Sequence, residues 1–242
     1  PQSWQGLWPV SGIKYGDWTG RLDPGEPFSW CSPFMMDVNR RFGGLDRLYG
    51  VSGARAIRTA HVAVVGIGGV GSWAAEALAR SGVNELTLID LDHVSESNIN
   101  RQIHALEATM GQAKVLAMRD RIVQINPDCH VTCIEEFVEP GNWPEMLPQG
   151  VSAVIDACDQ VKAKIAMAAW AMRSDKPFIS CGAAGGKRHA HLVDIEDLSR
   201  TTHDPLLAQV RYRLRKEFGA AREGKNVGVS CVFSRETVMA PD

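Results

Sequence analysis

The sequence lacks the paired cysteines of a zinc knuckle. Its six cysteines, none of which belongs to a C-x-x-C pair, are Cys31, Cys129, Cys133, Cys158, Cys181 and Cys231. A structural zinc site made of paired C-x-x-C knuckles therefore has no support. A recognisable secretory signal is also absent, so we expect reduced thiols and a cytoplasmic location.

Long apolar runs and an excess of charge of one sign are absent as well. No stretch of about 18 apolar residues occurs, and a membrane-spanning helix would need one. The formal net charge is −2 over 242 residues, so any surface that binds nucleic acid must be local. The composition, 45% hydrophobic and 22% charged, is that of an ordinary globular protein.

The two ends of the sequence differ from its middle. Four of the seven tryptophans lie in the first 35 residues, among many Gly, Pro and Ser and without periodicity. We expect residues 1–36 to be an extension with little regular structure; the alternative is an arm that binds a partner through tryptophan. Residues 37–242 are expected to form one domain. Its last stretch, GVSCVFSRETVMAPD, contains no closing element, so we expect a domain truncated at the C-terminal end.

A glycine-rich turn follows the first apolar run. Residues 61–71 read HVAVVGIGGVG, a helical pattern starts at Ser72 with that serine as a candidate cap, and the next apolar run closes on Asp90 and Asp92. The glycines are Gly66, Gly68, Gly69 and Gly71. Such a turn lets the backbone approach a phosphate, whose charge the helix start attracts. The pattern favours a nucleotide site; the alternative is a tight turn without a ligand.

Apolar runs and helical patterns alternate further along the chain. A helix is expected over about residues 112–124, strands over 129–134 and up to Asp156, a helix over 161–173 and a strand at 177–180. A basic loop, a possible strand and a basic helical pattern follow. The alternation predicts an α/β fold with a doubly wound, mostly parallel, Rossmann-like sheet and helices on both faces.

The long polar loop after the second strand distinguishes between nucleotides. Ser97, Asn98, Arg101 and Gln102 lie in it, and Lys114 follows. A dinucleotide has little use for this extra Arg and Lys, whereas a triphosphate under attack needs them because negative charge builds up on its phosphates. Asp159, at the end of a later strand, could hold the Mg²⁺ that accompanies ATP. Each charged residue alone would more often be a solvated surface group.

Together, GIGGVGS, LIDLD, SNINRQ, GQAK and DACDQ resemble the ubiquitin-activating-type adenylyltransferase superfamily. The resemblance implies an enzyme that binds ATP on the glycine turn and adenylates a carboxylate. It implies that Asp90 binds the ribose, that Arg101 and Lys114 steady the phosphates, and that Asn98 and Gln102 orient them. Asp159 would hold Mg²⁺.

RFGGLDRLYG, NRQIHAL, RIVQINP and GVSCVFS extend the likeness to the tRNA threonylcarbamoyladenosine dehydratases within that superfamily. This resemblance implies ATP-dependent cyclisation of N6-threonylcarbamoyladenosine in tRNA through adenylation of its carboxylate. It also implies a tRNA substrate, a homodimer, and a sulfur-relay or cysteine-desulfurase partner.

Several points stay open on the sequence alone. Gly44 stands where the superfamily often has an arginine that reaches the partner subunit's ATP, and Arg41 or Arg47 could replace it. Cys231 is a candidate catalytic thiol or a merely buried one. The basic segment 187–225 is a tRNA footprint or a solvated helix face. His189 and His191, within it, receive no ligand role.

Two alternative functions remain. An activator of a ubiquitin-like sulfur-carrier protein would share the ATP site and adenylate a protein C-terminus. A non-catalytic nucleotide-binding module would keep the glycine turn and would not need Arg101 or Lys114 for its activity.

Overall fold

The structure is a computed structural model that describes residues 37–222 and 224–239. The extension expected over residues 1–36 lies outside the described residues. Within the described part, no helix is both long enough and apolar enough to cross a membrane.

A seven-stranded sheet forms the centre of the fold, in the order β3-β2-β1-β4-β5-β7-β6. Its strands are β1 (His61–Val65), β2 (Glu85–Ile89), β3 (His130–Ile134), β4 (Ala153–Asp156), β5 (Phe178–Cys181), β6 (Val193–Asp197) and β7 (Ser230–Ser234). All neighbours run parallel except β6, which is antiparallel to β7. The predicted doubly wound, mostly parallel sheet is confirmed.

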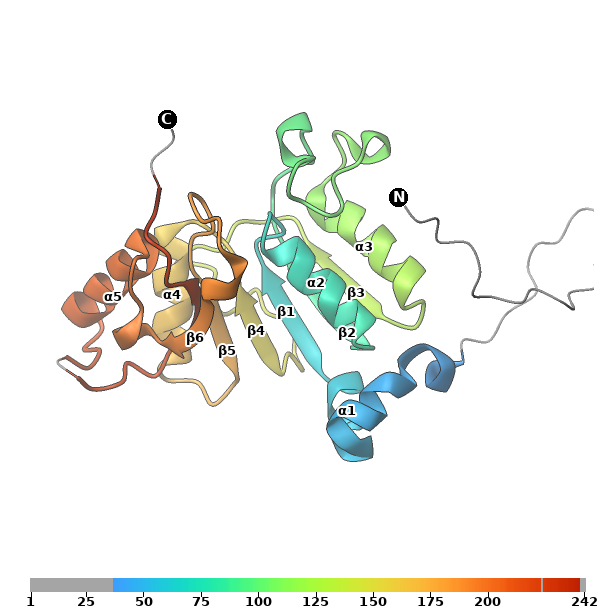
Figure 1. Cartoon of the computed structure of the whole chain (residues 1–242), viewed down its shortest axis with the longest axis horizontal. Helices are drawn as coiled ribbons and strands as arrows, with labels where there is room; N and C mark the ends of the chain where they lie inside the picture. Colours follow the sequence, from blue (N-terminus) through green and yellow to red (C-terminus); the bar gives the residue numbers. More distant parts are fainter. Residues whose placement is uncertain (1–36, 223, 240–242) are drawn as a thin grey trace, which may run out of the picture. The chain divides into compact units, whose positions relative to one another are not determined.

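The helices cover both faces of the sheet, as the strand alternation requires. Val62 and Val64 of β1 point to the face covered by α2 (Gly71–Arg80) and α3 (Lys114–Ile125). Ala63 and Val65 point to the opposite face, covered by α4 (Val161–Ala171). The last helix, α5 (Pro205–Glu217), packs on α4 and on β7. Figure 1 shows α2 and α3 lying over β1 to β3.

Local sequence explains the helix contacts. On α3, Val115, Met118 and Ile122 are fully buried at the spacing of one helix face. On α2, Ala75 and Ala79 are also fully buried, and their small size lets the helix lie close to the sheet. The first helix, α1 (Val38–Arg58), is two helices joined at Gly50, where φ is 73°.

Two local expectations were wrong. Ser72 does not cap α2, because the helix starts one residue earlier with Val70 at the cap position and no side-chain cap bond. Its hydroxyl lies 3.4 Å from the Ile103 amide, which donates to it. The stretch GVSCVFS, in which no closing element was recognised, forms β7 inside the sheet between β5 and β6. Five residues without clear alternation give a weak strand signal, and pairing on both sides overrides it.

Short 3-10 turns complete the connections. They are η1 (Glu96–Asn98), η2 (Glu107–Thr109), η3 (Ala190–Leu192) and η4 (Leu198–Arg200). The first two lie in the long loop after β2 and the last two flank β6. The carboxyl ends of β1, β4 and β5, together with the long loop, lie at the upper edge of the sheet in Figure 1.

Candidate nucleotide-binding site

A cavity of about 660 Å³ opens along the carboxyl ends of the parallel strands. Its walls come from the segments that follow β1, β2, β3, β4 and β5. The connections from β1 run toward β2 and β3, whereas those from β4 run the other way, so the winding reverses between β1 and β4. Ligands of open α/β sheets bind at this kind of switch point.

The glycine turn forms the floor of the cavity beside β1. Gly66 has φ of 86°, and a Cβ there would lie 2.8 Å from the Cα of Cys158, so no larger residue fits. A Cβ at Gly71 would overlap the carbonyl oxygen of Gly66. Gly68, in contrast, meets nothing within 4 Å. Two glycines thus allow the tight packing of the turn, and Gly68 leaves backbone open to a ligand.

Two acids at the end of β2 hold the turn and the lysine in place. The carboxylate of Asp90 accepts hydrogen bonds from the Ile67 amide at 2.6 Å and the Asp92 amide at 2.9 Å. Burial raises the pKa of Asp90 above its usual value. The ammonium of Lys114, which is almost fully buried, lies 2.7 Å from the carboxylate of Asp92. A cation is therefore held at the cavity wall before any nucleotide binds.

The side chain of Arg101 lies across the glycine turn. A Cβ on Gly69 would touch its Cγ at 3.3 Å. The guanidinium donates to the carbonyl of Ser97 at 2.7 Å, and the indole of Trp73 donates to the Arg101 carbonyl at 2.9 Å. Backbone and side chain of this arginine are both fixed close to where a phosphate would lie.

Two amides complete this wall. Asn98 accepts from the Ser95 amide at 3.0 Å and closes the turn of η1. Gln102 is only 5% exposed, and its carbonyl oxygen has no hydrogen-bond partner within residues 37–222 and 224–239. Buried polar atoms are normally paired, so this oxygen is an exception in the wall of the cavity.

The segment after β4 contributes Asp159, and a buried ion pair lies beneath it. Lys164 on α4 is 0% exposed and donates to Asp156 at 2.9 Å, to the Cys181 carbonyl at 2.7 Å and to Ser180 at 3.3 Å. Because it satisfies acceptors at the ends of both β4 and β5, it ties together the two strand ends that carry this side of the cavity.

Ten of the thirteen predicted site residues line the cavity: Gly66, Gly68, Gly69, Asp90, Asp92, Asn98, Arg101, Gln102, Lys114 and Asp159. Gly71 and Ser97 lie next to lining residues and serve the local backbone. The third exception is Cys231. The structure thus brings together residues spread over almost a hundred positions, and their individual roles stay predictions.

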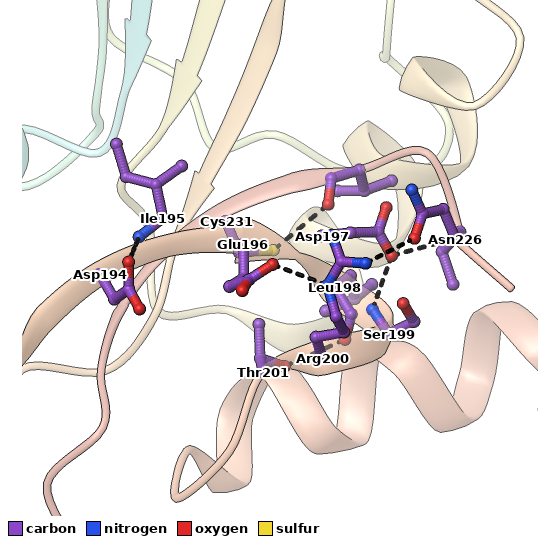
Figure 2. Close-up of polar contacts among 12 residues, drawn as sticks. Asp194, Ile195, Glu196, Asp197, Leu198, Ser199, Arg200, Thr201, Asn226 and Cys231 are labelled. Atoms are coloured by element: carbon purple, nitrogen blue, oxygen red, sulfur yellow. Dashed lines mark hydrogen bonds and ion pairs between the residues drawn. The ribbon is translucent and has the colours of Figure 1, made fainter. Parts of the chain in front are cut away.

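The position of Cys231 contradicts the idea of a catalytic thiol. It is 0% exposed, belongs to the core under α5, and its thiol faces the Val229 carbonyl (Figure 2). Burial raises the pKa of this thiol to about 12, so the thiolate is disfavoured. β7 fixes this orientation, and its strand pairing was not recognisable from the motif.

Much of the basic segment has internal partners. The guanidinium of Arg200 bonds to Glu196 at 2.7 Å and to Asn226 at 3.2 Å (Figure 2). Arg211 donates to the Leu198 carbonyl at 2.9 Å. Arg213 pairs with Glu217, Arg215 donates to the Ala221 carbonyl, and Lys187 donates to the His203 carbonyl. Several of these cations therefore have partners within the fold, and the tRNA footprint stays a prediction.

Arg41, Arg47, His189 and His191 are not among the residues that line the cavity. Arg41 donates to the Ile125 carbonyl at 2.7 Å, which ties α1 to α3, whereas Arg47 is exposed on α1. The rings of His189 and His191 lie 5.6 Å apart, and the described residues contain no cluster of three or more metal-ligating side chains.

Sequence reasoning missed two parts of the wall. Residues 136–138 follow β3, and residues 182–185 follow β5; both stretches line the cavity. Neither carries a motif. The only available signal was their position directly after predicted strands, because the carboxyl ends of parallel strands meet at one edge.

The fold and the cavity define a class: an α/β nucleotide-binding protein whose cavity is lined by a glycine turn, an arginine and a lysine. The family model described as "ThiF family" matches residues 41–223. The chain belongs to the ThiF family.

Individual relatives narrow the comparison. The chain is 48% identical over 203 residues to the tRNA threonylcarbamoyladenosine dehydratase of Escherichia coli strain K12, covering 84% of this chain and 76% of that protein. It is 37% identical over 150 residues to the molybdopterin-synthase adenylyltransferase of Salmonella typhimurium, covering 62% and 59%. A crystal structure of the E. coli dehydratase in complex with ATP matches with a TM-score of 0.82 and 47% identity, over 85% of this chain and 86% of that one.

Proposed function

We propose that this chain is an ATP-dependent tRNA threonylcarbamoyladenosine dehydratase. The observation that carries the proposal is the cavity in which the glycine turn, Arg101, Lys114 and Asp159 meet. The similarity to dehydratases over most of the chain supports it, as does the ATP complex of a relative.

The proposed orientation of ATP places its ribose at the end of β2 and its phosphates at the glycine turn. Asp90, at the end of β2, is the candidate for the ribose hydroxyls, and the open backbone at Gly68 for the phosphates. Lys114 and Arg101 are the two cationic side chains among the described residues that line the cavity. Asn98 and Gln102 offer amide groups for orientation.

The reaction then follows from phosphoryl chemistry. The carboxylate of N6-threonylcarbamoyladenosine attacks the α-phosphorus of ATP, and pyrophosphate leaves. An internal group of the same nucleoside attacks the activated carbonyl, loses a proton and expels AMP, which closes the ring. Arg101 and Lys114 stabilise the negative charge that builds up on the phosphates. No step requires Cys231.

Mg²⁺ is the proposed metal, held by Asp159. A single carboxylate suits this ion, because Mg²⁺ usually keeps several waters and binds one or two carboxylates plus substrate phosphates. When bound, the ion supplies charge neutralisation at the phosphates, and Asp159 positions it at the β4 side.

The remaining partners are proposed from the resemblance. The chain acts on tRNA in the cytoplasm and forms a homodimer, whose mass can be read by light scattering. Arg47 is a candidate for reaching the partner subunit's site. A sulfur-relay or cysteine-desulfurase protein is a further candidate partner.

Pyrophosphate exchange tests the proposal against the sulfur-carrier activator. Purified chain is incubated with ATP, Mg²⁺ and labelled pyrophosphate, and with one of three additions: tRNA carrying the modified adenosine, the same tRNA without it, or a carrier protein with a free C-terminus. We expect exchange, and formation of the cyclic nucleoside, only with the modified tRNA. Exchange that requires the carrier protein instead would overturn the proposal.

A further inference from the structure

The loop that follows β5 is held by two carboxylates from distant parts of the chain. This β5 loop, residues 182–189, contributes residues 182–185 to the cavity wall. The two acids are Asp204, which precedes α5, and Glu236, which follows β7. Neither takes part in the ATP contacts proposed above.

Asp204 fixes the start of the β5 loop. It is 4% exposed, and one of its oxygens accepts from the Ala183 amide at 2.9 Å. The other oxygen caps α5 by accepting from the Leu207 amide at 2.9 Å. A Cβ at Gly182 would overlap this carboxylate, so a larger residue at this position would force the backbone and Asp204 apart. The loop start is thereby joined to the first turn of a helix.

Glu236 fixes the end of the β5 loop. It is 9% exposed, and one of its oxygens accepts from the amides of Arg188 and His189, both at 2.8 Å. These bonds hold the pKa of Glu236 below its usual value, with the His189 amide as the main cause. Lys187 donates to the carbonyl of Glu236, and the Met239 amide donates to the Gly186 carbonyl at 3.1 Å. The segment after β7 thus contacts the β5 loop at each residue from Gly186 to His189.

The location of the β5 loop suggests what it holds. With ribose at Asp90 after β2 and phosphates at the glycine turn after β1, ATP takes up the part of the sheet edge between β2 and β4. The part of the cavity at β5 is left for the second substrate, whose carboxylate must reach the α-phosphorus. Positioning of reactants within such a site has large effects, since a shift of about 1 Å can cost about 100-fold in rate.

We propose that Asp204 and Glu236 are positioning residues that fix the β5 loop as the wall against which the carboxylate-bearing nucleoside of the RNA is held. This rests on the proposed function for the identity of the second substrate. The residues act through the loop backbone and touch no reacting atom, so the second substrate is affected and ATP is not.

Glu236→Ala and Glu236→Gln test this proposal. Alanine removes the acceptor of both amides, whereas the glutamine oxygen can still accept them. We expect kcat/KM for the modified tRNA to fall about tenfold or more in Glu236→Ala and to recover in Glu236→Gln, while the Kd of ATP, measured by calorimetry, changes less than about twofold. Asp120→Asn, an exposed carboxylate on α3 paired with Arg119, is the matched control and keeps wild-type values.

Hydrogen exchange read by mass spectrometry measures the loop itself. Peptides that contain the amides of Arg188 and His189 should exchange at least about tenfold faster in Glu236→Ala than in wild type. If Glu236→Ala does not fold, Asp204→Asn decides, because its side chain can cap α5 or accept from Ala183 but cannot do both. Unchanged kcat/KM for tRNA, or equal losses for tRNA and ATP, would overturn the proposal. If the wild-type chain shows no tRNA-dependent turnover, the proposed function is overturned instead. In that case, unchanged hydrogen exchange at Arg188 and His189 in Glu236→Ala would still reject the role of Glu236.

Discussion

The two sides of the cavity are built in different ways. The side formed by β1 and β2 consists of residues that belong to recognisable motifs: the glycine turn, the two acids after β2 and the following polar loop. The side formed by β4 and β5 depends on contacts of residues outside those motifs, such as Lys164 with Cys181 and Glu236 with His189. Tertiary contacts hold both sides, but only the first side can be recognised from sequence motifs.

We expect the largest effect on stability from a substitution in the buried ion pair of the β4–β5 side. Lys164→Met removes one member of a fully buried ion pair and leaves Asp156 uncompensated. We expect the free energy of unfolding to fall by about 3–5 kcal/mol, measured by urea denaturation. Lys162→Met, an exposed lysine on the same helix, serves as the control and should stay within about 0.5 kcal/mol of wild type. If Lys164→Met lowers the free energy of unfolding by less than about 1 kcal/mol, the contact between the ends of β4 and β5 does not depend on the Lys164–Asp156 ion pair.

On the β1–β2 side, we expect a substitution to reduce activity while leaving the stability of the fold unchanged. Lys114→Ala removes a cation held against Asp92 at the cavity wall. We expect kcat for cyclisation to fall about 100-fold, as for other groups that stabilise transition-state charge, with the melting transition nearly unchanged. Arg101→Ala should behave alike, whereas Lys162→Ala keeps full activity. Intact biological activity in the first two variants would favour the non-catalytic nucleotide-binding module.

A smaller effect concerns pH and lies on the β1–β2 side. His104 is 1% exposed, and neither ring nitrogen has a partner among the described residues. Burial lowers its pKa to about 4. The unfolded chain binds a proton near pH 6.5 and the folded chain does not, so stability falls as the pH drops from 6.5 toward 4. We expect a loss of about 2 kcal/mol between pH 7.5 and 5 from this group.

His104→Leu provides the check on that pH dependence. Denaturation of both proteins at pH 7.5 and pH 5 should give a smaller difference between the two pH values for the variant, by about 2 kcal/mol. An equal pH dependence in both proteins would assign the effect to other groups, such as His61, whose pKa burial also lowers.

The comparison also explains what the sequence could predict. The parallel sheet followed from alternating apolar runs and helical patterns, and the pocket residues from Gly66 to Lys114 followed from position after strands. Cys231 could not be judged from its motif, because its burial results from β7 entering the sheet between β5 and β6. The same holds for the basic segment: only the fold reveals that Arg211 bonds to the Leu198 carbonyl.

The place of β7 in the sheet has a consequence for biosynthesis. Among the strands of the described residues, β7 is the one neighbour of β6, yet β7 leaves the ribosome more than thirty residues later. The nascent chain can therefore assemble β1 to β4, with the glycine turn, while β6 still lacks its neighbour, in keeping with the tendency of N-terminal parts to fold first during synthesis. Glu236 emerges two residues after β7. A stalled chain that ends before Glu236 would contain the glycine turn but would lack the carboxylate that holds the end of the β5 loop.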